Sequence, residues 1–314
     1  MSCYYFYKNS FTAQIGIIEI RRKLKLKQRQ RVIMKLKALI LSTMILSMNL
    51  YSVEKQSDKL RILVYNTHGL PEIFISDNPK KRFPIIGQKT QDFNISLLQE
   101  DYSHHEELLS GLAQESLAIR GGLGGSLICP VCTGSGLTSV FNLPKNWSIE
   151  VENETYETCS GWLRGANDCF AYKGFQIIKI TLPNDKRFFI VNTHMDAGIR
   201  DTDRSAREIQ LKHIISTIKQ RTTNEALIIA GDLNLNSKNP EDVKLLENFK
   251  EELRLTDPFA GHNISKKWTI LDYVLYKQGE ELEFMIVSVG EDESFVTKEG
   301  PLSDHPALVV ELSI

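Results

Sequence analysis

RFFIVNTHMD (residues 187–196) and ALIIAGDLN (residues 226–234) are the two stretches that decide the fold. Each opens with a run of Phe, Ile, Val, Leu or Ala, which is the composition of a β-strand. Each run then ends in polar residues, His194 in the first stretch and Asp232 with Asn234 in the second. The sequence therefore predicts two strands that carry chemically active side chains at their carboxyl ends.

The same pattern recurs at four other places in the chain. ILVYN ends in Asn66 and ISLLQE ends in Glu100, while two later runs carry Asp272 and the pair Asp304 and His305 at their starts. If the two later strands run antiparallel to the others, all these residues meet along one edge of the sheet. Singly, each could be a turn former, a cap or a buried core residue. Together, polar residues of metal-ligand and acid-base type at six strand ends indicate a site.

The rest of the chain from residue 60 onward alternates short apolar runs with polar or helix-like stretches, without a repeat or a linker. This alternation predicts one α/β domain. Helices are expected at residues 104–115, 205–219 and 240–250. Strands are expected at residues 61–66, 95–99, 137–142, 175–182, 187–192, 226–230, 270–276, 282–289 and 307–312.

The composition is that of a globular protein, and the charge is unevenly distributed. The chain has 314 residues, of which 42% are hydrophobic and 25% charged, and this excludes a disordered, collagenous or coiled-coil protein. Residues 1–52 contain ten Lys or Arg and one acidic residue, so residues 53–314 carry a net charge of −10. So acidic a body repels polyanions and disfavours tight non-specific binding of nucleic acid.

The basic amino-terminal segment is interpreted as a leader rather than as part of the fold. From Met34, the segment MKLKALILSTMILSMNLYS has Lys35 and Lys37 ahead of a mostly apolar stretch at residues 38–50, as in a secretory signal peptide. That stretch is shorter than the roughly 20 residues needed to span a bilayer. A membrane anchor is the alternative. We expect residues 1–52 to be a non-structural leader and residues 53–314 the catalytic domain.

Cysteine usage agrees with export. Apart from Cys3 in the leader, the chain has four cysteines, Cys129, Cys132, Cys159 and Cys169. An even set of cysteines in an exported protein favours disulfides, with Cys159 to Cys169 as the preferred pair and Cys129 near Cys132. A zinc site built on CPVC is the alternative, but the other two cysteines are ten residues apart, with no histidine between them.

Six motifs in one order resemble those of the endonuclease/exonuclease/phosphatase superfamily. They are YNTHG (65–69), LLQE (97–100), NTHMDAG (192–198), GDLN (231–234), LDYVL (271–275) and SDHPAL (303–308). The resemblance spans residues 61–312 and implies a single-domain, four-layer α/β/β/α sandwich of the DNase I-like type. It also implies that Glu100 binds Mg²⁺ with Asn66 near the metal and the phosphate. His194 would contact the scissile phosphate, and Asp232 with Asn234 would polarise it.

The resemblance assigns the remaining residues to proton transfer. Hydrolysis of a phosphodiester needs a base for water, and His305 suits neutral pH because an ordinary histidine has a pKa near 6.5. Asp272 would orient His305, with Asp304 beside them. Mg²⁺ needs few carboxylate ligands because it retains several waters, so no dense ligand cluster is expected.

The branch of the superfamily is inferred from two further features. The central NTH motif carries a histidine that pancreatic-type deoxyribonucleases and sphingomyelinases share, and the segment GANDCFAYKGF (165–175) is similar to one in bacterial sphingomyelinases. We therefore expect a secreted or periplasmic, monomeric phosphodiesterase that acts on a phospholipid at a membrane surface. An exported DNase I-like nuclease is the alternative, with Lys266, Lys267, Arg200 and Arg204 as its basic groove. A non-catalytic binding module on the same fold ranks last, because no site residue is missing.

Overall fold

The computed structural model describes residues 58–70, 72, 78–123, 133–162, 168–262 and 270–314, together with Lys27, Met34 and Lys37. By its internal contacts the chain divides into two compact units, Met1–Ser57 and Asp58–Ile314. In the first unit, the three described residues are helical and exposed. The rest of the expected leader and signal peptide lies outside the described residues.

Two sheets form the second unit. The six-stranded sheet has the order β10-β13-β1-β2-β4-β3 and the five-stranded sheet the order β5-β6-β7-β8-β9. The first sheet consists of β10 (Met285–Glu291), β13 (Leu308–Ser313), β1 (Lys59–Asn66), β2 (Ile95–Gln99), β4 (Thr138–Phe141) and β3 (Leu117–Arg120). The second consists of β5 (Ser148–Thr155), β6 (Gly174–Thr181), β7 (Arg187–His194), β8 (Ala226–Asp232) and β9 (Asp272–Lys277). A small separate pair joins β11 (Val296–Thr297) and β12 (Gly300–Pro301).

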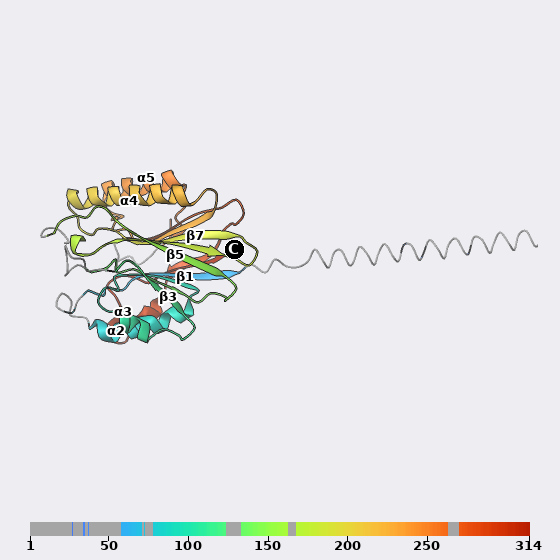
Figure 1. Cartoon of the computed structure of the whole chain (residues 1–314), viewed down its shortest axis with the longest axis horizontal. Helices are drawn as coiled ribbons and strands as arrows, with labels where there is room; N and C mark the ends of the chain where they lie inside the picture. The colour runs from blue at the N-terminus through green and yellow to red at the C-terminus, as the bar shows by residue number, and fades with distance from the viewer. Residues whose placement is uncertain are drawn as a thin grey trace, which may run out of the picture. The chain divides into compact units, whose positions relative to one another are not determined.

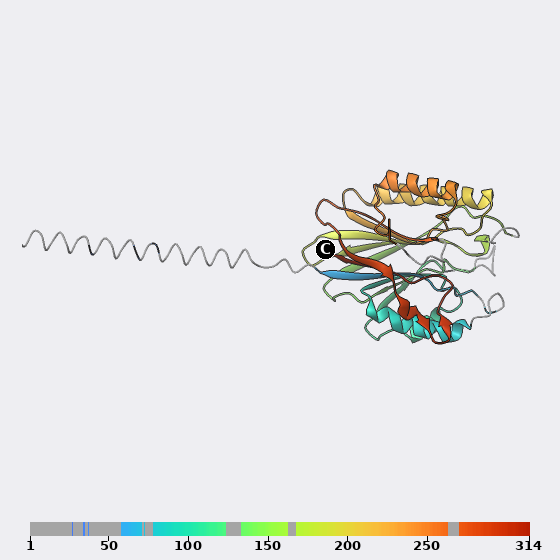
Figure 2. The same cartoon turned by 180° about the vertical axis from the view of Figure 1, so that it is seen from behind.

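Helices cover the outer face of each sheet (Figures 1 and 2). Helices α4 (Asp201–Arg221) and α5 (Pro240–Leu253) lie on the five-stranded sheet, and α2 (Pro79–Lys89) and α3 (His105–Ser110) lie on the six-stranded sheet. Short 3₁₀ turns occur at Thr90–Asp92, Asp168–Phe170 and Glu293–Phe295. The predicted four-layer α/β/β/α sandwich is confirmed.

The central strands, such as β2 and β8, are apolar on both sides because both of their faces are buried. In β1, Ile62 and Val64 join the core between the sheets, whereas Leu63 and Tyr65 point into the core beneath α2. A third core lies beneath α4 and α5 and includes Leu211 and Phe249. Burial on both faces explains why the strands read as continuous apolar runs rather than as alternating ones.

The two later strands run antiparallel to their neighbours, as the predicted site requires. β9 runs antiparallel to β8, and β13 runs antiparallel to β1. Consequently the starts of β9 and β13 lie at the same edge as the carboxyl ends of β1, β2, β7 and β8. All six polar strand ends therefore share one edge of the sandwich.

α2, β3, β5 and the two-residue strands β11 and β12 were missed, the helix expected at 104–115 ends at Ser110, and one helix was misplaced at its start. α2 contains Pro84 and a basic first turn, so it lacks a clear helical pattern. β5 is an edge strand whose sequence SIEVENET is rich in charged residues, and β3 has only four residues. α4 begins at Asp201 rather than at residue 205, because Asp203 accepts a hydrogen bond from the backbone of Arg200 and caps the first turn.

One predicted disulfide is present. Cys159 and Cys169 are bonded, with their Cα atoms 5.2 Å apart. Cys129 and Cys132 lie outside the described residues, so their pairing stays a prediction. Within the described part of the chain, no helix is both long enough and apolar enough to cross a membrane.

Candidate active site

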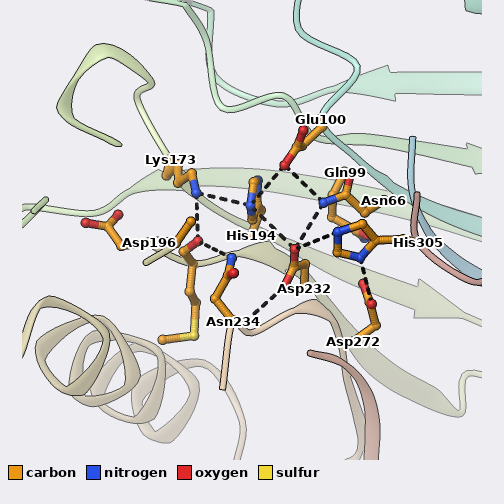
Figure 3. Close-up of polar contacts among 12 residues, drawn as sticks. Asn66, Gln99, Glu100, Lys173, His194, Asp196, Asp232, Asn234, Asp272 and His305 are labelled. Carbon is orange, nitrogen blue, oxygen red and sulfur yellow. Dashed lines mark hydrogen bonds and ion pairs between the residues drawn. The ribbon is translucent and has the colours of Figure 1, made fainter. Parts of the chain in front are cut away.

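Three strands of the five-stranded sheet place acidic and histidine side chains in one row. In the strand register, His194 of β7 is opposite Asp232 of β8, and Asp232 is opposite Asp272 of β9. The six-stranded sheet supplies Asn66 at the end of β1 and Glu100 directly after β2. Figure 3 shows these side chains converging from both sheets.

The backbone at this edge takes conformations that regular strands do not. Glu100 and Asn234 have left-handed φ values of 59° and 50°. Gly231 has a φ of 136°, and a Cβ atom there would lie 1.9 Å from the carbonyl oxygen of Thr193. Only glycine therefore lets β8 approach β7 closely enough to bring Asp232 beside His194.

Asn66 bridges the two principal carboxylates. Its Nδ2 donates to Glu100 Oε1 at 3.1 Å and to Asp232 Oδ2 at 3.0 Å. Its Oδ1 accepts from the backbone N–H of His68 at 3.0 Å, which fixes the orientation of the amide. One amide thus holds two acidic side chains from different sheets close together.

The carboxylates of Glu100 and Asp232 lie close together in surroundings where a bound cation would stabilise their charges. Burial raises the pKa of Glu100, and the nearby Asp232 raises it further. Burial, followed by the charge of Asp272, raises the pKa of Asp232 to about 6. Ligand atoms of Glu100, His194 and Asp232 lie within 4.8 Å of one another. Buried carboxylate oxygens that repel each other are suited to Mg²⁺, so the residues present fit this ion.

His305 and Asp272 form a hydrogen-bonded pair. His305 Nδ1 lies 2.8 Å from Asp272 Oδ2, and His305 Nε2 faces Asp232 Oδ2 at 3.9 Å. Burial alone would lower the pKa of His305, but the carboxylates of Asp272, Asp232 and Asp304 together raise it to about 10. Asp272 is itself buried, so the imidazole is both oriented and made more basic.

His194 has the opposite surroundings. Burial, and then the charges of Lys173 and His305, lower the pKa of His194 well below the ordinary value. The Lys173 ammonium donates to Nε2 at 3.1 Å, and the hydroxyl of Tyr102 lies 3.4 Å from Nδ1. His194 is therefore a neutral ring whose two nitrogen atoms already have partners.

Lys173 is the site residue that the sequence analysis missed. The side chain is buried, and its ammonium also contacts Asp168 Oδ1 at 2.7 Å and the carbonyl oxygen of Met195 at 2.8 Å. The available signal was a lysine in the segment FAYKGF, just before the buried strand β6. The segment indicated the sphingomyelinase branch, but its lysine was assigned no place in the site.

The two remaining predicted residues differ in position. Asn234 accompanies Asp232: its backbone N–H donates to Asp232 Oδ1 at 2.9 Å, and its Nδ2 donates to the carbonyl oxygen of Met195 at 3.0 Å. Asp304 has a 59% exposed side chain that lies 3.6 Å from His68 Nδ1. The structure thus brings seven predicted residues together and leaves Asp304 at the rim.

Two proteins with similar sequences carry the names phospholipase C and sphingomyelinase C. No family model matches the chain. A phospholipase C of Staphylococcus aureus is 26% identical over 232 residues, which cover 67% of this chain and 66% of that protein. A sphingomyelinase C of Bacillus cereus is 26% identical over 258 residues, which cover 74% of this chain and 76% of that protein. The chain thus matches slightly less than two thirds of the staphylococcal protein.

Solved structures agree on the fold. A beta toxin of S. aureus with bound magnesium ions is 20% identical with a TM-score of 0.62, over 81% of this chain and 99% of that one. An endonuclease/exonuclease/phosphatase family protein of Bacteroides thetaiotaomicron is 18% identical with a TM-score of 0.60, over 82% and 96%. The chain therefore shares the DNase I-like fold of these proteins.

Proposed function

We propose that this protein is a Mg²⁺-dependent phosphodiesterase that releases the headgroup of a phospholipid, with a sphingomyelinase-like preference. The observation that carries this proposal is the oriented His305–Asp272 pair, in which Nε2 of His305 faces Asp232, one of the two carboxylates that Asn66 bridges. A base lies within a few ångströms of a site suited to a divalent cation. That combination is what hydrolysis of a phosphodiester by water requires.

In the proposed reaction, the carboxylate charge that raises the pKa of His305 would be offset by Mg²⁺ near Asp232. The ring would then be neutral, and His305 Nε2 takes a proton from a water molecule. The water oxygen forms a bond to phosphorus, and the bond from phosphorus to the lipid alcohol oxygen breaks. Asp272 Oδ2 accepts the Nδ1–H of His305 and stabilises the imidazolium, as in a catalytic triad. The imidazolium then returns its proton to the departing alkoxide. The products are an alcohol and a phosphomonoester.

The other residues bind and polarise the phosphate. Glu100, with the Asn66 amide beside it, would hold Mg²⁺, and the ion supplies neutralisation of charge on the phosphoryl oxygens. The buried Lys173 ammonium, next to His194, offers a second positive charge at the same edge. Asp232 and Asn234 are joined by a hydrogen bond, and Asn234 Nδ2 and the Lys173 ammonium both donate to the carbonyl oxygen of Met195.

The nuclease alternative receives less support. Arg204, one of its four basic candidates, is paired with Asp201, Glu241 and Asp242. Lys266 and Lys267 lie outside the described residues. The names of the relatives favour a lipid, and the net charge of −10 for residues 53–314 disfavours a polyanion. Export is supported by the Cys159–Cys169 disulfide and by the segment that starts at Met34.

The test compares substrates side by side. Purified protein is incubated with Mg²⁺ or with EDTA, and release of headgroup from sphingomyelin and phosphatidylcholine is measured beside cleavage of plasmid DNA. We expect Mg²⁺-dependent headgroup release that is lost in His305→Ala. Faster cleavage of DNA than of either lipid would identify a nuclease instead.

A further inference from the structure

One buried arginine joins two chain segments that are far apart in the sequence. Arg82 lies in helix α2, and only 7% of it is exposed to solvent. Its Nη1 donates to the carbonyl oxygen of Thr67 at 3.0 Å and also to that of Leu302, and its Nη2 donates to the carbonyl oxygen of His68 at 3.0 Å. We call Arg82 and these three carbonyl oxygens the arginine clamp.

Both clamped segments lead directly into the active site. Thr67 and His68 follow Asn66, whose amide bridges the two principal carboxylates. Leu302 lies three residues before His305, the proposed base. One side chain therefore holds the backbone on both the metal side and the base side of the site.

A buried serine ties the same two segments together. The hydroxyl of Ser303 donates to the carbonyl oxygen of Asn66 at 2.7 Å, and its oxygen accepts from the N–H of His305 at 3.2 Å. Since Ser303 directly follows Leu302, the guanidinium and the hydroxyl hold adjacent parts of the chain. The distance between Asn66 and His305 is thus fixed from two directions.

The first segment also contacts the backbone that carries Glu100. The N–H and the hydroxyl of Thr67 donate to the carbonyl oxygen of Gln99 at 2.9 Å and 2.8 Å, and the N–H of Gly69 donates to that of Glu100 at 2.8 Å. A Cβ atom at Gly69 would lie 2.3 Å from the Glu100 oxygen and 2.4 Å from the ring of Phe83 in α2. The packing is so close that any shift of this segment is passed on to Glu100.

The shape of the guanidinium group suits it to this task. Arginine presents five N–H donors in a rigid, planar fork, whereas lysine has a point charge on a flexible stem. Because a buried carbonyl or N–H that loses its partner costs free energy, the fork favours the arrangement of both segments that satisfies all three bonds. His68 has a left-handed φ of 52°, so the backbone here is held in a conformation that it would rarely adopt alone.

We propose that Arg82 is a positioning residue that sets the Asn66 amide and the His305 ring at the distance that hydrolysis requires. This inference rests on the proposed function, which assigns Asn66 to the metal side and His305 to proton transfer. All three clamp bonds end on backbone carbonyl oxygens, so Arg82 acts through the backbone. Misplacement of a catalytic group by about 1 Å can cost on the order of 100-fold in rate.

The same sheet offers a matched control. Arg61 lies on β1, near the end of the strand away from Asn66. It donates to the carbonyl oxygen of Asp92 at 3.1 Å and to the carboxylate of Asp292 at 2.8 Å, and its guanidinium lies 4.3 Å from the centre of the Phe93 ring. An Arg61→Lys variant therefore alters an arginine that joins distant segments without touching the clamp.

Hydrogen exchange at two backbone N–H groups reports the order of the clamped segments without any need for activity. The N–H of His68 is bonded to Asn66 Oδ1, and that of His305 is bonded to Ser303 Oγ. In metal-free, full-length Arg82→Lys, we expect both groups to exchange about tenfold faster than in wild type. Exchange in Arg61→Lys should match wild type at both positions.

Kinetics on a soluble diester, bis(p-nitrophenyl) phosphate, test the consequence for catalysis. With Mg²⁺, Arg82→Lys should lower kcat by about 10- to 100-fold and leave KM little changed, since the loss is one of geometry in the transition state. Arg61→Lys should keep both constants. Millimolar guanidinium should restore part of kcat in Arg82→Ala, and methylammonium, which has the charge without the fork, should restore less. Thermal melting confirms that each variant is folded.

The outcomes separate this inference from the proposed function. Exchange and kcat that are both unchanged in Arg82→Lys overturn the clamp, as does an equal loss of kcat in Arg61→Lys. A raised KM with an unchanged kcat overturns it in favour of direct contact with the substrate. Wild-type protein that hydrolyses neither the soluble diester nor a lipid overturns the proposed function. Faster exchange at both N–H groups in Arg82→Lys alone would then still support the clamp, and unchanged exchange would overturn it too.

Discussion

The active site has two sides that treat a histidine in opposite ways. On the carboxylate side, Asp272 and Asp232 surround His305 and raise its pKa to about 10 despite burial. On the lysine side, burial and the charge of Lys173 lower the pKa of His194. The same side chain type is thus prepared for proton transfer on one side and kept neutral on the other. The difference lies in the charged neighbours of the two rings, which are carboxylates for His305 and an ammonium for His194.

Loss of the base on the carboxylate side is expected to have the largest effect. His305→Ala and Asp272→Asn should each lower kcat, by roughly 10² to 10⁴ for the loss of general-base help. The double variant should be hardly worse than His305→Ala, because groups that act as a unit are non-additive. Steady-state kinetics at saturating Mg²⁺ measure all three. Penalties that simply multiply would show that the pair is not the base.

Removal of the metal-binding charge should have the next largest effect. Glu100→Gln keeps the shape of the side chain but removes the charge that would hold Mg²⁺, so activity should fall by about a thousandfold. Folding should be little affected, since burial already raises the pKa of Glu100 and its charge is unfavourable without a cation. Turnover and calorimetric titration of Mg²⁺ test both points. Near-normal turnover at saturating Mg²⁺ would exclude Glu100 as the principal ligand.

The carboxylate side could be predicted from sequence, whereas the lysine side could not. Each residue of the former ends or begins an apolar run, so the position of Asp232 or His305 follows once the strand directions are known. Lys173 precedes β6 in an ordinary-looking segment, and its role depends on contacts with Asp168 and Met195 that only the folded chain creates.

The fold shows a similar division. Strands buried on both faces, such as β2 and β8, were predicted within a few residues, because their apolar runs have abrupt ends. The edge strand β5 and helix α2 were missed. The exposed face of β5 carries charged residues, such as Glu150, which pairs with Lys179 of β6. In α2, Pro84 interrupts the hydrophobic pattern. Periodicity reports burial, and it is weak where an element is exposed or interrupted.

A third prediction separates charge from packing on the lysine side. Lys173→Met should lower activity by roughly 10- to 100-fold, and it should destabilise the protein by about 3–5 kcal/mol, because the buried Asp168 loses its partner. Asp168→Asn in the same chain should restore most of the stability but not the activity. Denaturant unfolding and kinetics measure these effects, with Lys179→Met, at a half-buried surface lysine, as the control. Recovery of activity along with stability would reduce Lys173 to a structural role.

A fourth prediction concerns the titration of His305 in the metal-free protein. Its raised pKa means that the protonated ring stabilises the folded state below the ordinary pKa near 6.5, and that this stabilisation is lost as the pH rises towards 10. Asp272→Asn should bring the pKa down and flatten stability over that window. NMR titration of the imidazole and unfolding at several pH values provide the measurements. An unchanged His305 pKa in Asp272→Asn would show that Asp272 does not set it.

The smallest effect on activity is expected from the disulfide, which anchors the lysine side without taking part in chemistry. Cys159 and Cys169 are ten residues apart. Closing a loop of this length lowers the entropy of the unfolded chain and so stabilises the folded protein by about 2–3 kcal/mol. The Cys159→Ser, Cys169→Ser variant should therefore melt at a lower temperature. Since Asp168 precedes Cys169 and positions Lys173, activity should fall a few-fold, through the lysine side alone. His305 should keep its raised pKa in this variant, because its partners Asp272 and Asp232 come from β9 and β8. A shift in the His305 titration on loss of the disulfide would mean that the two sides are not independent, and the comparison between them would fail.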